Sequence, residues 1–287
     1  MEQQSYPGKA KWAKIMHVSS SGYYDWKQGR AARKNRREKR EHEVLAVFSE
    51  GKGHYGAERI CGVIRERGGH CSFSTVNRVM KQHNLYSSHC KRKQRSLTDS
   101  RAARDHRYEN LTKDLEIARP FQVLSSDITY IRTSEGVDYL CQIKDCFSNM
   151  ILGVCQQERM TADIVLKALE NTQKRWKLPA GVIFHSDRGS QYTAKEVKKQ
   201  IEKYAWKQSW SAVGRPGDNA WSESFFSLLK KEMIHYHHYS SREELRQSCF
   251  EYIFTFYNHQ RAQKRLGYIS PAAFIQRYSS VHSQDVA

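Results

Sequence analysis

The chain reads FQVLSSDITYI at 121–131, VDYLCQIKDCF at 137–147 and NMILGVCQQE at 149–158. Each run is short and rich in β-branched and aromatic residues, and turn-forming residues separate one run from the next. Runs of this kind predict strands, and three of them in succession predict a β-meander. We therefore expect a β-sheet at the centre of the protein.

Helix and strand signals alternate after this meander. We expect a helix over 162–176, a short strand in GVIFHSD (181–187), a helix over 193–204 and a fifth strand in WKQSWSA (206–212). A further helix is expected over 241–257. This order of elements predicts an α/β fold, in which a mixed five-stranded sheet is flanked by helices on its faces.

The charge of the protein is strongly positive and unevenly distributed. Its 287 residues carry a formal net charge of +18, and residues 1–110 hold 24 Lys and Arg against 11 Asp and Glu. Cations clustered in one part of a chain favour a polyanionic partner, most simply nucleic acid. An anionic membrane surface is the weaker interpretation, because no large apolar face is interleaved with the basic stretches.

The sequence predicts a cytoplasmic protein without a membrane partner. The N-terminus lacks the apolar stretch of a signal peptide, and no apolar run approaches the length of a membrane-spanning helix. The seven cysteines are widely spaced and form no CxxC pair, which argues against a disulfide framework and against a structural zinc site.

Two short helices are predicted upstream of the sheet, after a basic stretch at 30–40 (RAARKNRREKR). The first lies in HYGAERICGVIRERGG (54–69) and ends at a Gly-Gly pair; the second, TVNRVMKQHN (75–84), follows Ser74 as its expected N-cap. Such a pair is typical of a helix-turn-helix, although ordinary αα-hairpins share the pattern. Donor-rich side chains of the second helix would face DNA: Asn77, Arg78 and Lys81.

Three acidic residues of the α/β region have positions that suit chemistry. Asp127 lies inside the first predicted strand, where a charge is costly unless it is paired. Asp187 ends a predicted strand at the edge where open α/β sheets bind ligands, and Glu223 opens a predicted helix. Three carboxylates suit Mg²⁺ or Mn²⁺ better than zinc. Asp138 and Asp145 on the second strand run are rival candidates.

The helix that carries Glu223 lies in GRPGDNAWSESFFSLLKKE (214–232). On a helical wheel Lys230 falls about 20° from Glu223, whereas Phe225 and Leu229 point to the other side. We therefore expect the apolar side to be buried and Glu223 and Lys230 to share a polar face. An acid at a helix start also complements the helix dipole, which is the ordinary structural explanation of this Glu.

These motifs together resemble those of the insertion sequence three family of bacterial transposases, which belong to the DDE group and are similar to retroviral integrases in core fold. The resemblance rests on SDITYI (126–131), HSDRGSQYTA (185–194) and the 214–232 stretch. It also rests on the 35 residues between Asp187 and Glu223 and on a Lys seven residues after that Glu. Further stretches that are similar to family motifs are HVSSSGYYDW (17–26), HYGAERI (54–60) and YNHQRAQKRLGYISPAAF (257–274).

The resemblance implies a ribonuclease-H-like core in which Asp127, Asp187 and Glu223 hold two Mg²⁺ or Mn²⁺ ions. It implies an enzyme that exposes a 3′ hydroxyl at the end of an insertion sequence, and that hydroxyl would then attack a second phosphodiester directly. Gln263 stands where many relatives carry a His, which puts a catalytic role of that position in doubt. The domains would be a basic helical segment (1–45), a helix-turn-helix region (46–86), a basic linker (87–118), the catalytic core (119–235) and a helical, basic tail (236–287).

The resemblance also implies partners for the protein. We expect it to bind double-stranded DNA, both the terminal inverted repeats of the element and the target, as a homo-oligomer in the bacterial nucleoid. The product of an upstream frame is a further candidate partner. Basic residues outside the helix-turn-helix that are expected to contact DNA are Arg188, Arg215, Lys230 and Arg261.

Two other functions share part of this pattern. A simple metal-dependent nuclease would use the same acids but would hydrolyse DNA without joining strands. A non-catalytic DNA-binding regulator would need only the first 110 residues, and it leaves the three spaced acids unexplained.

Overall fold

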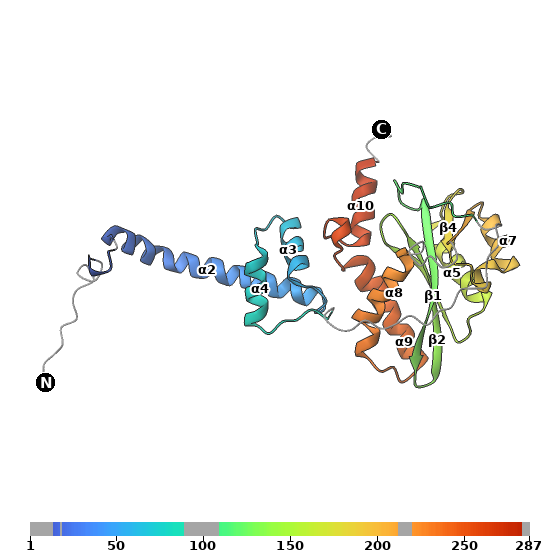
Figure 1. Cartoon of the computed structure of the whole chain (residues 1–287), viewed down its shortest axis with the longest axis horizontal. Coiled ribbons are helices and arrows are strands. Elements are labelled where there is room, and N and C mark those ends of the chain that lie inside the picture. Colours follow the sequence, from blue (N-terminus) through green and yellow to red (C-terminus); the bar gives the residue numbers. More distant parts are fainter. Residues whose placement is uncertain (1–13, 18, 89–108, 212–219, 283–287) are drawn as a thin grey trace.

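The protein consists of a helical module, from which one long helix extends, and a five-stranded α/β body, as Figure 1 shows. The computed structural model describes residues 14–17, 19–88, 109–211 and 220–282. Within these residues, no helix combines the length and the apolar character that crossing a bilayer requires. The helical region and the mixed five-stranded sheet confirm the fold class that the sequence predicts.

The helical module is built from α2 (Ser20–Glu50), α3 (Ala57–Glu66) and α4 (Phe73–Gln82). Apolar side chains at helical spacing on α3 and α4 are buried against Val44 and Val47 of α2. α3 ends just before Gly68, whose φ of 80° is accessible to glycine and rare for other residues. The Gly-Gly pair therefore ends the helix as the sequence predicts.

The start of α4 corrects one expectation. Ser72, and not Ser74, is the N-cap, because Ser72 has the extended backbone of a cap and its Oγ accepts the N–H of Thr75 at 3.3 Å. Ser74 already belongs to the first helical turn, where its Oγ lies 3.1 Å from that of Ser72. The helix consequently begins two residues earlier than the sequence indicated, which shortens the turn after α3.

The α/β body contains one sheet in the order β3-β2-β1-β4-β5. Its strands are β1 (Val123–Thr133), β2 (Gly136–Asp145), β3 (Ile151–Gln157), β4 (Ile183–Ser186) and β5 (Lys207–Trp210). The first three form the predicted meander with antiparallel pairing, and β4 pairs in parallel with both β1 and β5. A parallel neighbour requires a crossover connection, and helix α5 (Ala162–Trp176) lies in the one before β4.

Helices cover both faces of this sheet (Figure 1). The apolar core on one face includes side chains of α5 and α7 (Lys195–Lys203). The core on the other face includes side chains of α8 (Ala220–Glu232), α9 (Arg242–Phe250) and the π-helix η3 (Glu251–Tyr257). The helix expected over 241–257 is thus present, but its second half has π hydrogen bonding. Position 235 is the predicted end of the catalytic core, and residues on both sides of it belong to this second apolar core.

The C-terminal segment connects the helical module to the body; it contains η4 (Lys264–Leu266) and α10 (Pro271–His282). The hydroxyl of Tyr55 in the module accepts the N–H of Ala262 at 2.7 Å and donates to the C=O of Gln260 at 3.3 Å. α3 approaches the same segment at Gly62, where an added Cβ would lie 2.3 Å from the ring of Tyr268. The module therefore docks on the C-terminal segment.

Candidate active site

Asp127 lies in the middle of β1, the central strand of the sheet. Because side chains alternate along a strand, Asp127 shares a face with Ile131, which packs in the core under α8. Its side chain is half-buried, and its Oδ1 accepts the N–H of Ile128 at 2.8 Å. The first candidate acid therefore points to the face that α8 covers.

Asp187 directly follows β4, the strand beside β1. In the parallel register Ser125 pairs with His185, so Asp127 and Asp187 each stand two residues beyond the same paired position. Asp187 is open to solvent, and its Oδ1 accepts the N–H of Gly189 at 3.0 Å. The two aspartates therefore stand level on neighbouring strands.

Glu223 lies in the first turn of α8 and is exposed. Two contacts hold the start of this helix against the sheet. The Nζ of Lys144 donates to the C=O of Trp221 at 2.8 Å, and the ring of Trp221 meets His185 edge-on, with 6.1 Å between the centroids. Because His185 precedes Asp187 by two residues, the start of α8 is brought to the strand end that carries that aspartate.

The three carboxylates interact electrostatically. The pKa of Asp127 is raised to about 7, first by burial and then by the negative charge of Asp187, with a smaller contribution from Glu223. The N–H of Ile128 and the ammonium of Lys230 act in the opposite direction. Asp187 and Glu223 reach solvent, but the surrounding protein partly desolvates their carboxylates and so raises the pKa of each. All three acids are thus harder to ionise here than in water.

This donor set fits a hard divalent cation. A positive ion beside the three carboxylates would relieve the repulsion that favours protonation of Asp127, and oxygen ligands are those that Mg²⁺ and Mn²⁺ prefer. Among the residues that the structure describes, no three Asp, Glu, His or Cys side chains are placed to ligate a single ion. The three acids are therefore gathered without being arranged as the ligands of one ion.

The two rival acids on β2 have structural partners. Asp138 is buried and forms an ion pair with Arg246 of α9, whose Nη2 lies 2.9 Å from its Oδ1. Asp145 is also buried and accepts the N–H of Phe121 at 2.9 Å and the hydroxyl of Ser148 at 2.5 Å. Both carboxylates connect segments of the fold, so the structure favours neither of them as a metal ligand.

The residues expected to contact DNA are distributed over several elements. On α4, Arg78 and Lys81 are exposed and Asn77 is half-buried. Lys230 lies close enough to Asp127 for its charge to act on that carboxylate, and its Nζ is 5.7 Å from the centroid of the Tyr130 ring. Two others lie close to the site in sequence: Arg188 donates from Nε to the C=O of Ser211 at 3.0 Å, whereas Arg215 is outside the described residues.

Arg261 does not lie on a surface that DNA could reach, which corrects the expectation from the sequence. Its side chain is 2% exposed and forms an ion pair with Glu232 of α8, which is 0% exposed. The Nη2 and Nε atoms donate to that carboxylate at 2.6 to 3.1 Å, and the hydroxyl of Tyr252 donates to it at 2.7 Å. The planar fork of an arginine suits a carboxylate as well as a phosphate, so the basic motif alone does not distinguish the two.

One signal in the sequence could have identified this pair. Glu232 falls about 180° from Glu223 on the helical wheel, on the side where Phe225 and Leu229 are buried as predicted. An acid in the middle of an apolar helix face predicts a buried cationic partner, because an unpaired buried charge is very costly. The sequence does not name that partner.

The structure also reveals a polar cluster beneath the carboxylates that the sequence interpretation missed. In the antiparallel register, Gln142 pairs with Asp127, and Lys144 pairs with Ser125 on the same face. Gln142, Lys144 and Ser125 are buried, and within the described chain the Gln142 amide has no hydrogen-bond partner. Burial lowers the pKa of Lys144 to about 8. Gln142 and Lys144 are two residues apart in a predicted strand, so the sequence alone places both polar side chains on one face of the sheet.

His185 is a further residue whose role was not predicted. Its ring is buried, with Nδ1 2.9 Å from the Oγ of Ser209 and Nε2 3.2 Å from the Oγ of Ser211. These contacts join the ends of β4 and β5. Together with the Trp221 contact, they support the strand end from which Asp187 projects.

Comparison with known proteins places these features in a family. The family described as integrase core domain matches residues 94–216, a second integrase core family matches 223–277, and an HTH-like domain matches 34–94. The chain is 36% identical over 265 residues to "Transposase InsF for insertion sequence IS3A" of Escherichia coli (strain K12), covering 91% of both chains. It is also 36% identical to "Insertion element IS600 uncharacterized 31 kDa protein" of Shigella sonnei, covering 92% of this chain and 97% of that protein.

Among solved structures, the chain is similar to the simian T-cell lymphotropic virus intasome, with a TM-score of 0.47 and 15% identity over 80% of this chain and 73% of that chain. It is also similar to the catalytic domain of Mos1 mariner transposase, with a TM-score of 0.40 and 16% identity over 47% and 71%. The sequence relatives decide the family, because they match nearly the whole chain at a much higher identity. The protein belongs to the IS3 family of insertion-sequence transposases, and its chain contains an HTH-like domain followed by an integrase core.

Proposed function

We propose that Asp127, Asp187 and Glu223 are the catalytic carboxylates of this transposase and that they hold two divalent cations, Mg²⁺ or Mn²⁺. The proposal is supported above all by the level register of the two aspartates on neighbouring strands. It is supported further by the pKa of Asp127, which responds to the charges of both other acids. Acids that repel one another in this way suit a site that is completed by a cation.

The proposed reaction has two steps at phosphorus. Water first cleaves a phosphodiester at the end of the element and leaves a free 3′ hydroxyl. The oxygen of that hydroxyl then forms a bond to a second phosphorus, whose previous 3′ oxygen departs with the proton, so that the joined strand has a normal 3′–5′ phosphodiester. Bound cations would supply activation of the attacking oxygen and charge stabilisation of the leaving one. No covalent bond between protein and DNA is formed.

The chain's own residues would hold and surround these acids. The N–H groups of Ile128 and Gly189 fix the carboxylates of Asp127 and Asp187. The buried Gln142 amide, which pairs in register with Asp127, has free donor and acceptor capacity within the described chain for a water molecule at this edge. Lys230, whose positive charge reaches Asp127, would contact a DNA phosphate.

We further propose double-stranded DNA as the partner, both the terminal inverted repeats of the element and the target. The uneven positive charge of the chain and the exposed Arg78 and Lys81 on α4 support this partner. The region 46–86 would bind DNA and the region 119–235 would catalyse. Assembly as a homo-oligomer on DNA, with the upstream-frame product as a further partner, completes the proposal.

The test of the catalytic assignment is Glu223→Gln, assayed for cleavage and strand transfer with a labelled duplex that carries one element end. We expect both activities to be lost while DNA binding persists, because the change removes one carboxylate and leaves the basic surface intact. The matched control is Glu196→Gln, since Glu196 is also an exposed acid in the first turn of a helix, α7. Both variants lose the same interaction with a helix dipole.

The control separates the two explanations of Glu223. If Glu196→Gln is as active as the wild type and Glu223→Gln is inactive, the helix dipole cannot account for the loss. Full strand transfer by Glu223→Gln would overturn the assignment. Chelation of divalent cations should likewise stop cleavage and leave DNA binding unchanged. Hydrolysis without joined products would instead identify a simple nuclease.

A further inference from the structure

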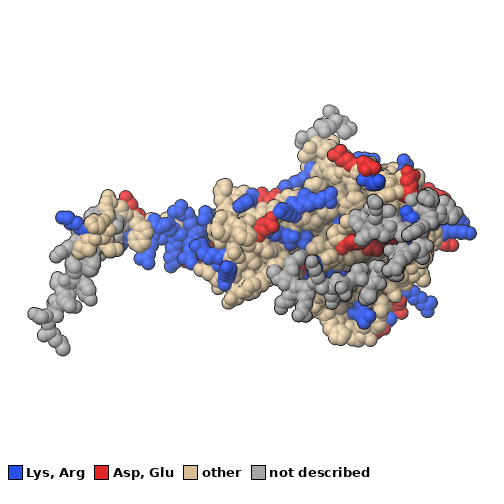
Figure 2. Space-filling model, viewed as in Figure 1, with Lys and Arg blue, Asp and Glu red and all other residues tan. Residues whose placement is uncertain are grey.

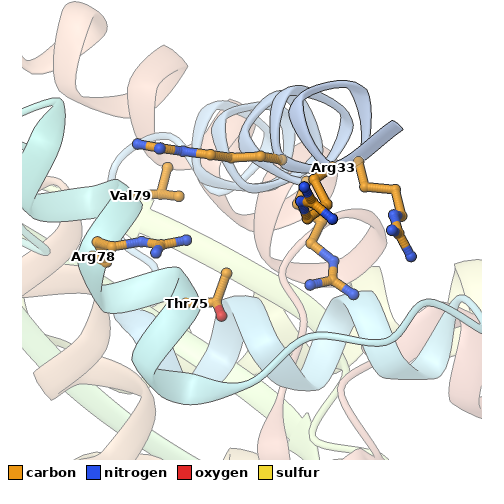
Figure 3. Close-up of a pocket in the computed structure, with 7 residues that line it drawn as sticks. Arg33, Thr75, Arg78 and Val79 are labelled. Carbon is orange, nitrogen blue, oxygen red and sulfur yellow. The ribbon is translucent and has the colours of Figure 1, made fainter. Parts of the chain in front are cut away.

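A groove lined by five arginines lies between α2 and α4. Its walls are Arg33, Arg36, Arg37 and Arg40 of α2 together with Thr75, Arg78 and Val79 of α4, and it encloses about 250 Å³. Figure 3 shows Arg33 and Arg78 as they project from the two helices. Figure 2 shows Lys and Arg gathered along the part of α2 that extends away from the body. We call this feature the arginine groove.

The groove follows from the geometry of α2. The face of α2 that packs in the helical module carries Val44 and Val47, which are buried. Residues Arg33, Arg37 and Arg40 lie on the same face, all within about 40° of the direction of Val44 or Val47. Towards its N-terminus, α2 extends beyond the apolar contacts of the module. On this face the residues therefore change from valine to arginine, and the arginines lie beside α4.

The positive charge of the groove is not neutralised by the protein within the described chain. None of its five arginines forms an ion pair there, and the guanidinium of Arg33 donates to a backbone C=O of its own helix. Two neighbouring acids of α2 are engaged elsewhere. Glu38 lies 3.7 Å from Lys34, and Glu41 lies 2.6 Å from the Nε2 of His83. Five clustered cations without acids repel one another and favour a polyanionic ligand.

We propose that the arginine groove binds the phosphate backbone of double-stranded DNA and thereby orients α4 on the duplex. This proposal rests on the proposed function, because it assigns a surface to the DNA partner. Arg78 belongs both to the groove and to the exposed face of α4 that carries Lys81, so a strand held in the groove lies next to that helix. Arginine donors suit phosphate oxygens, and backbone contacts of this kind set orientation without reading sequence.

The dimensions of the groove agree with a strand rather than a small anion. Arg33 to Arg40 span seven residues of helix, or about 10 Å at 1.5 Å per residue. One DNA strand presents about three phosphates over that length of duplex axis, at one per 3.4 Å. A single phosphate or a free nucleotide would occupy only part of such a row of guanidinium groups. The row therefore suits several successive phosphates.

The test is the double variant Arg33→Ala/Arg37→Ala, with Lys27→Ala/Lys39→Ala as the matched control. Both lose two positive charges from exposed positions of α2, but Lys27 and Lys39 point about 120° to either side of Arg33. The affinity of each full-length protein for a labelled duplex of unrelated sequence is measured over a series of salt concentrations. Far-UV circular dichroism of each variant confirms that its helices are intact.

The salt dependence gives the expected magnitude. Each phosphate contact contributes about 0.9 to the slope of log affinity against log salt, so loss of two contacts should reduce the slope by about 1.8. A fourfold rise in salt concentration should then reduce the ratio of the wild-type affinity to the variant affinity by about tenfold. The lysine control should keep the wild-type slope. Arg33→Lys/Arg37→Lys should retain most of the slope, because the charge remains.

Several outcomes would overturn the proposal. Equal slopes for the arginine variant and the wild type would show that the groove does not contact DNA. Equal effects of the arginine and lysine variants would show that only the overall positive charge of α2 matters. Equal affinity for single strands, or preference for anionic lipid vesicles, would identify another polyanion as the ligand. Strand transfer by the wild type is assayed in parallel. Its absence would contradict the transposition chemistry without affecting the slopes, so the two failures are distinguishable.

Discussion

The buried ion pair between Glu232 and Arg261 yields the sharpest stability prediction. We expect Arg261→Met to destabilise the protein strongly, because the methionine fills much of the same space but leaves the Glu232 carboxylate without its cation. In the wild type that carboxylate accepts three short contacts from the guanidinium, at 2.6, 2.8 and 3.1 Å, and one from Tyr252. In the variant the Tyr252 hydroxyl would still donate to the carboxylate, but the three guanidinium contacts would be lost.

The magnitude follows from burial. The two side chains are 0% and 2% exposed, so water cannot replace the lost partner. Removal of one partner of a buried pair costs about 3–5 kcal/mol, which is a large part of the 5–15 kcal/mol that stabilises a typical domain. Replacement of both charges, in Glu232→Leu/Arg261→Met, should cost clearly less than Arg261→Met alone, because no unpaired buried charge remains.

The assay is urea unfolding of the single and double variants, with the free energy of unfolding obtained by linear extrapolation. Lys264→Met is the control, since it breaks the exposed ion pair with Glu58 and should change the unfolding transition little. Affinity for DNA should be unchanged in the folded fraction of Arg261→Met. Unaltered stability together with weaker DNA binding would refute the structural role and restore Arg261 as a DNA contact.

Three further predictions test other features of the fold. Gly153→Ala should lower the free energy of unfolding by about 1–3 kcal/mol in a urea titration, because the added Cβ would lie 2.1 Å from the Oγ1 of Thr172 on α5. Ser72→Ala should lower the stability of the helical module by about 1 kcal/mol, measured by hydrogen exchange of α4, and Ser74→Ala should have a smaller effect. Asp138→Asn should cost about 1–3 kcal/mol of stability in thermal unfolding but leave the strand-transfer rate of the folded protein unchanged.

Much of the secondary structure could be predicted from local patterns. The three strand runs between 121 and 158 occur as predicted, and the helix expected over 162–176 has those boundaries in the structure. Strand alternation and helical periodicity depend on neighbours only a few residues apart, so they can be recognised in the sequence. The cap of α4 was assigned wrongly because two serines lie two residues apart, and only the backbone conformation distinguishes them.

The candidate site required more than local pattern. Five acids in the α/β region were plausible ligands from the sequence, and the structure separates them by their partners. Asp138 finds Arg246, which lies 108 residues further along the chain. Asp127, in contrast, stands level with Asp187 through the parallel pairing of two strands. Contacts over such separations depend on the sheet order, which no local pattern contains.

The sequence by itself determined the order of helices and strands, the excess of positive charge in the first part of the chain and, through its linked motifs, the transposase family. Only the tertiary structure decided which charges are available to a ligand. It buries Arg261 against Glu232 and leaves Arg33 and Arg78 facing a common groove. The physical reason is that the free energy of a charge depends on its solvent exposure and on its partners, and both are set by residues far away in the sequence.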